Sequence, residues 1–161
     1  MPYSNEMQTV AEIAIAMAGF AGIITALRAS AYARGSVDYA RLRELLLTSL
    51  GGVFFAFIPA LISGLSEEPL WVWQMPLLAF GLYHVSLMVT FFRATGLGGP
   101  KAYEWVLIPL ALTIVAIQFS VGLGLFPEFQ PEAYFLSLLW ILFIAANNFA
   151  VLLLEGATDD K

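Results

Sequence analysis

The chain has 161 residues, of which 60% are hydrophobic and only 12% are charged. Soluble domains carry about 25% charged residues, so this composition excludes a globular protein in water and predicts an all-α protein embedded in lipid. The net charge of −5 argues against nucleic-acid binding, and the absence of cysteine excludes disulfides and thiolate metal sites.

Five apolar segments approach or exceed the roughly 20 residues that a helix needs to cross a bilayer core. Each should be a helix, because a backbone in lipid must satisfy its own hydrogen-bonding groups. Together they fill most of the chain, so we predict a polytopic membrane helix bundle and a single integral membrane domain over residues 1–161. In chain order, the predicted spans are 6–28, 41–64, 70–93, 102–126 and 133–155.

The first span contains the stretch TVAEIAIAMAGFAGIITALR, in which small side chains recur every four residues. Helices in lipid associate through close van der Waals contact, which small side chains allow. We therefore expect this stripe to pack against another helix, within one subunit or between subunits. The glycine-rich SLGGVFFA of the second span is a natural partner. The predicted packing residues are Ala14, Ala18, Gly22 and Ala26.

Glu12 places a carboxylate within the first span, about 7 Å to the outer side of its predicted midplane. A charge at this depth costs a few kcal/mol in contact with lipid, so it should face protein or water. Three interpretations stay open. The carboxyl group is protonated and hydrogen-bonds Gln118 or a backbone carbonyl, it interacts with the positive end of its own helix, or it lines a path for cations or protons.

The connections between the spans fall into a basic set and an acidic set. With five spans, all seven Lys and Arg residues lie on one side of the membrane, whereas segments 63–69 and 126–132 carry glutamates and no base. Basic residues favour the cytoplasmic side, so we predict the N-terminus outside and the C-terminus inside. A four-span arrangement, with the first segment flat on the membrane, is disfavoured because that segment lacks a charged face. We expect Pro59 and Pro109 to kink their spans.

Polar residues of the remaining spans fall into two predicted layers. Gln118 lies near the depth of Glu12, whereas His84, Asn147 and Asn148 lie just to the inner side of the midplane. His84 either makes a packing hydrogen bond or supplies one ligand to a pigment or haem. Asn147 and Asn148 point about 100° apart on their helix, so one can face the bundle and the other a partner helix or subunit.

No catalytic arrangement emerges from the sequence. The single histidine has no acid at its predicted depth, and the chain contains no HExxH motif, phosphate-binding loop or nucleophile elbow. We predict that the protein is not an enzyme, that it holds no metal, and that it needs no cofactor unless His84 carries a pigment or haem.

The stretches AEIAIAMAGFAGI and LRELLLTSLGGVFFAFIPAL, joined by an Arg-containing connection, resemble a group of uncharacterised small bacterial multi-pass membrane proteins. The resemblance is confined mainly to the first two spans. It implies a bacterial origin and a location in the cytoplasmic (inner) membrane, and it carries no activity.

These features predict a homo-oligomeric assembly that forms a pore or ion-conducting path. Glu12 and Gln118 would line its outer part, and His84 with Asn147 or Asn148 would line its inner part. The alternative is an accessory or scaffold subunit that packs on a larger membrane complex and transports nothing. A weaker alternative is a carrier of pigment or haem through His84. The expected surroundings are the lipid bilayer and other subunits, without nucleic acid.

Overall fold

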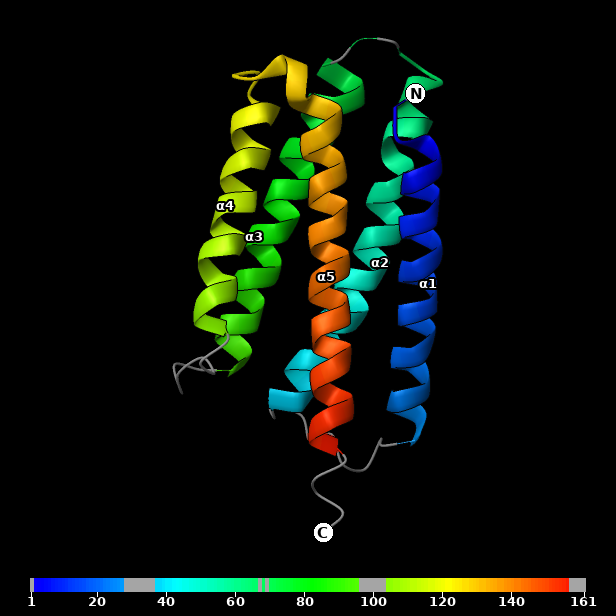
Figure 1. Cartoon of the computed structure of the whole chain (residues 1–161), viewed down its shortest axis with the longest axis vertical. Helices are drawn as coiled ribbons and strands as arrows, with labels where there is room; N and C mark the ends of the chain where they lie inside the picture. The colour runs from blue at the N-terminus through cyan, green and yellow to red at the C-terminus, as the bar shows by residue number, and fades with distance from the viewer. Residues whose placement is uncertain (1, 28–36, 67, 69, 96–103, 157–161) are drawn as a thin grey trace.

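The computed structural model of the chain describes residues 2–27, 37–66, 68, 70–95 and 104–156. Within these ranges the structure is helical and contains no strand. Five long helices lie side by side, and successive helices run in opposite directions (Figure 1). The elements are α1 (Ser4–Leu27), α2 (Val37–Ser63), the π-helical turn η1 (Leu70–Gln74), α3 (Met75–Thr95), α4 (Glu104–Gly122), the 3-10 turn η2 (Pro127–Phe129) and α5 (Gln130–Gly156).

The helices have the length and composition of a membrane protein. In the described part of the chain, four stretches are long and apolar enough to cross a bilayer: Ser4–Ala26, Asp38–Ser63, Leu70–Ala94 and Pro127–Leu154. The apolar stretch of α4, Val106–Gly122, is shorter.

The helix α4 ends at Gly122, before the predicted end of the fourth span at residue 126. Gly124 adopts a φ of +81°, a left-handed conformation that glycine adopts without steric cost. The N–H of Leu125 then donates to the carbonyl of Ser120, and the N–H of Gly124 donates to the carbonyl of Val121. This is the Schellman pattern of a helix C-terminus, so the backbone of this turn fixes the end of α4.

The helices α2 and α5 form the centre of the bundle. α2 packs against α1, α3 and α5, and α5 also packs against α1 and α4. Aromatic side chains fill the space between them, with Phe55 stacked on Phe80 at 4.1 Å between ring centroids and Phe80 at 5.9 Å from Tyr134. The described arginines Arg41, Arg43 and Arg93 lie at the end where α2 begins and α3 ends, which we call the basic end. The opposite end, the acidic end, carries Glu6, Glu68, Glu128 and Glu132.

The buried face of α1 follows a different repeat from the one that the small residues suggest. Its buried residues alternate at intervals of three and four along the helix, which keeps one face toward the neighbouring helices: Met7, Val10, Ala14, Met17 and Ala21. A stripe with a four-residue repeat drifts about 40° around the helix at each step. Ala14 is accordingly buried, Ala18 is half-buried, and Gly22 and Ala26 are exposed.

One part of the predicted packing of α1 is present. Ala14 faces the glycine-rich part of α2, where a Cβ placed on Gly52 would lie 3.4 Å from the Cβ of Ala14. The contact therefore joins the two predicted partners, but within one chain the four-residue stripe as a whole does not coincide with the packing face.

A tyrosine compensates for the proline within α2. Pro59 has no N–H, so the carbonyl of Phe55, four residues earlier, lacks its usual helical donor. The hydroxyl of Tyr134 in α5 donates to that carbonyl at 2.7 Å, in a buried position. The hydrogen bond therefore satisfies a backbone group that lipid would leave unsatisfied, and it fixes α5 against α2.

Replacing Tyr134 with phenylalanine should lower the free energy of unfolding by about 1–3 kcal/mol, because the Phe55 carbonyl then stays buried without a donor. In a Pro59→Ala background the same replacement should cost much less, since the backbone N–H of the introduced alanine can donate to the Phe55 carbonyl along the helix. Unfolding of the purified protein in detergent measures both effects.

Tyr3→Phe is the matched control, because the Tyr3 hydroxyl makes only an exposed contact of 3.5 Å with Glu132. An equal cost of Tyr134→Phe with and without Pro59 would show that the hydrogen bond does not serve the proline.

Candidate functional site

A buried pair of polar side chains links α3 to α4. The Nδ1 atom of His84 lies 3.1 Å from Nε2 and 3.3 Å from Oε1 of Gln118. The exposed fractions are 4% for His84 and 0% for Gln118, so both side chains of this contact are buried. Phe80, one turn earlier in α3, stacks on the imidazole at 5.7 Å. Nδ1 is therefore engaged within the protein, and Nε2 is the ring nitrogen that remains for a ligand.

This contact corrects the predicted assignment of Gln118 and His84 to separate layers. Counting from the centre of each span assumes that all spans are centred at one depth. In the structure the end of α4 lies beside the first turn of α3, eight residues after the predicted start of that span at Leu70, since a Cβ on Gly122 would meet the side chain of Leu78 at 2.9 Å. α4 is thus displaced toward the basic end, and the turn after Gly122 with η2 covers the remaining distance.

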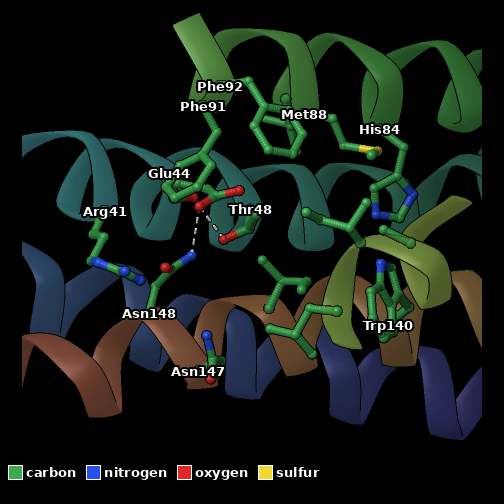
Figure 2. Close-up of a pocket in the computed structure, with 15 residues that line it drawn as sticks. Arg41, Glu44, Thr48, His84, Met88, Phe91, Phe92, Trp140, Asn147 and Asn148 are labelled. Atoms are coloured by element: carbon green, nitrogen blue, oxygen red, sulfur yellow. Dashed lines mark hydrogen bonds between the residues drawn. The ribbon is translucent and has the colours of Figure 1, made fainter. Parts of the chain in front are cut away.

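A second polar group lies nearer the basic end, between α2 and α5 (Figure 2). Asn148 Nδ2 donates to Glu44 Oε2 at 3.0 Å, and Asn148 is 2% exposed. Asn147 is half-buried. Asn148 is therefore buried within the bundle, whereas Asn147 is partly exposed.

Sequence reasoning missed the residues of α2 at this site. It used the basic residues only to predict topology, but Arg41 is 2% exposed and its guanidinium carbon lies 6.0 Å from the ring centroid of Phe91. Arg41, Glu44 and Thr48 are spaced by three and four residues, which places them on one face of α2. That spacing was a readable signal for a polar face directed into the bundle.

A cavity of about 90 Å³ lies between the two polar groups. It is lined by α2, α3, α4 and α5, with Arg41, Glu44 and Asn148 toward the basic end and His84 with Trp140 toward the other (Figure 2). The walls between them are apolar. A water needs about 10–15 Å³ of such space, so the cavity has room for roughly six to nine heavy atoms. A tetrapyrrole is several times larger, so the cavity as it stands does not fit a haem.

Glu12 lies apart from this cavity. Its side chain is exposed on α1, on the side opposite the buried face, and its Oε1 accepts a hydrogen bond from Gln8 Nε2 at 3.0 Å. Gln118 is paired with His84 instead. The structure therefore does not bring Glu12 and Gln118 together, and it separates the predicted polar residues into an external group on α1 and an internal group around the cavity.

The described residues contain no group of three or more histidine, aspartate or glutamate side chains that is arranged to hold a metal ion. Comparisons of the sequence with protein-family models and with curated proteins, and of the fold with solved structures, find no match. The resemblance to small bacterial membrane proteins stays a prediction.

A double-mutant cycle tests the buried pair. Gln118→Leu should lower the free energy of unfolding by about 1–3 kcal/mol, because it strands the imidazole of His84. His84→Leu should cost a similar amount by stranding the amide of Gln118. The double variant should be more stable than either single variant, since both polar groups are then gone.

Chemical unfolding in detergent gives the free energies of unfolding of the three variants. Gln74→Leu is the control, because Gln74 is a half-buried glutamine at the acidic end. Purely additive losses in the double variant would contradict a mutual hydrogen bond.

Proposed function

We propose that this chain is a five-span protein of the bacterial inner membrane, and that several copies assemble around a cation-conducting path lined by α1. The N-terminus lies outside and the C-terminus inside, because the basic end carries Arg41, Arg43 and Arg93 and basic residues favour the cytoplasmic side. α4 counts as a span because its 19 residues extend about 28 Å, close to the thickness of a bilayer core. The bacterial location rests on the resemblance of the first two spans.

The observation that carries the assembly is the exposure of Glu12. Glu12 lies about 5 Å from the midpoint of α1, a helix of membrane-spanning length. A carboxylate in contact with lipid near this depth costs about 3 kcal/mol or more. A single copy therefore exposes an unfavourable group, and neighbouring copies around an aqueous path remove that cost.

The residues near Glu12 form a continuous line along α1. They lie within about 40° of one direction around the helix. All are exposed: Asn5, Gln8, Glu12, Ala16, Gly19, Ile23 and Ala26. Facing a common axis, they give a polar mouth at the acidic end, a ring of carboxylates, and a narrow part of small and apolar side chains.

This lining differs from the one expected from sequence. A ring of carboxylates attracts cations, and a ring of Ile23 side chains provides a hydrophobic constriction where the path can close. His84, Gln118 and Asn148 hydrogen-bond within the bundle, so they are left out of the path. The proposal assigns the protein no catalytic role.

The alternative is an accessory subunit, in which a helix of another protein covers the same face of α1. Gly19 and Gly22 would allow close approach, because a Cβ on either residue would meet nothing within 4 Å. In both proposals another polypeptide packs against this face of α1 in the cell. The proposals differ in whether that polypeptide is a second copy of the chain or a different protein.

Mass measurement in nanodiscs and flux into proteoliposomes separate the two. We expect several copies per particle and cation flux that Glu12→Gln reduces about tenfold, because the local concentration of cations falls with the carboxylate charge. Glu6→Gln removes an exposed carboxylate of the first turn of α1, away from the line, and should leave flux unchanged.

A single copy per particle without flux would favour the accessory subunit. Equal flux in the wild type and in Glu12→Gln would remove Glu12 from the path.

A further inference from the structure

We propose that the cavity between α2, α3, α4 and α5 binds a neutral, lipid-soluble carbonyl compound of the quinone class. The site lies within one chain, so it is independent of the assembly through α1. Binding here and conduction along α1 can therefore fail separately. The proposal concerns binding and includes no redox step.

The first observation is an unsatisfied donor. The indole Nε1 of Trp140 is buried, and no described residue accepts a hydrogen bond from it. Trp140 lines the cavity, and its indole nitrogen points toward His84 (Figure 2). A buried N–H without an acceptor costs about 1–3 kcal/mol, and buried indoles usually find a partner. The geometry fits an acceptor oxygen of a ligand in the space between Trp140 and His84.

The second observation is the arrangement of His84. Its Nδ1 faces the amide of Gln118, with the shorter distance, 3.1 Å, to the amide nitrogen. With the amide nitrogen donating to Nδ1, the imidazole carries its proton on Nε2. His84 and Trp140 then direct two N–H groups into one end of the cavity, a pattern that binds a carbonyl oxygen rather than a donor such as an amine.

The third observation concerns the walls and the charge. Phe91, Phe92 and Trp140 contribute aromatic rings to the lining, which suits a flat ring. Space for roughly six to nine heavy atoms matches a six-membered ring with two carbonyl oxygens. Toward the basic end, Asn147 offers an amide donor for the second oxygen.

The charged lining residues, Arg41 and Glu44, have opposite signs, so the site favours a neutral ligand. Phe92, on the α3 side of the lining, is 38% exposed. The cavity therefore borders the outer surface of the bundle there, and an alkyl tail on the ring can continue into the bilayer. These features together favour a ligand with a polar ring and an apolar chain that partitions into lipid.

Titration of the protein in nanodiscs with a decyl-substituted benzoquinone tests the proposal, with binding followed by calorimetry. We expect saturable binding that Trp140→Phe weakens about tenfold, because one hydrogen bond of about 1.4 kcal/mol is lost. Trp71→Phe is the matched control, since Trp71 is exposed and does not line the cavity. Ala111→Phe fills the cavity and should abolish binding.

Decylbenzene has the same ring size and tail but no carbonyl group, so it should bind at least tenfold more weakly. Circular dichroism and unfolding temperatures establish that each variant is folded. Absence of saturable quinone binding to the wild type overturns the proposal. So does equal binding of decylbenzene, and so does unchanged quinone binding in a folded Trp140→Phe variant.

Discussion

The structure depends on the requirement that polar groups within apolar helices find partners in the protein, because lipid offers none. The Tyr134 hydroxyl satisfies the carbonyl that Pro59 leaves open, and the Tyr83 hydroxyl donates to the carbonyl of Leu47 at 2.7 Å. His84 with Gln118 joins α3 to α4, and Asn148 with Glu44 joins α5 to α2. Dispersion contacts alone allow many relative positions of smooth apolar helices, whereas these few directional bonds select one.

Both functional proposals arise from polar groups whose surroundings one copy of the chain does not complete. Glu12 has Gln8 as a partner but lies on the exposed side of α1, which one copy of the chain leaves uncovered. The Trp140 N–H lies inside the bundle without an acceptor, beside a cavity. Glu12 requires a partner from outside the chain, and the Trp140 N–H requires a ligand inside the bundle. Because lipid cannot satisfy polar groups, these two groups show where one copy of the chain lacks a binding partner.

Composition and hydropathy were enough to predict the class of the protein and its five helical segments, because the bilayer sets the length and polarity of such segments. The relative depths of the helices were not predictable, since the turn after Gly122 shifts α4 against α3 and brings Gln118 to His84. The four-residue stripe on α1 did not coincide with the face that is buried within one chain, because that face follows the seven-residue repeat through Met7, Ala14 and Ala21. The burial of Arg41 was not predictable either, since a sequence shows depth along a helix more clearly than the direction of each side chain.

The central claim is that the polypeptide crosses the bilayer an odd number of times, with its basic end in the cytoplasm. The chain has no cysteine, so single cysteines introduced at Asn5 and at Asp159 can be labelled without background. An impermeant maleimide applied to intact cells should modify the cysteine at position 5, and should modify the cysteine at position 159 only after the membrane is opened. Modification of both positions from the same side would contradict the five-span arrangement and the functional roles that rest on it.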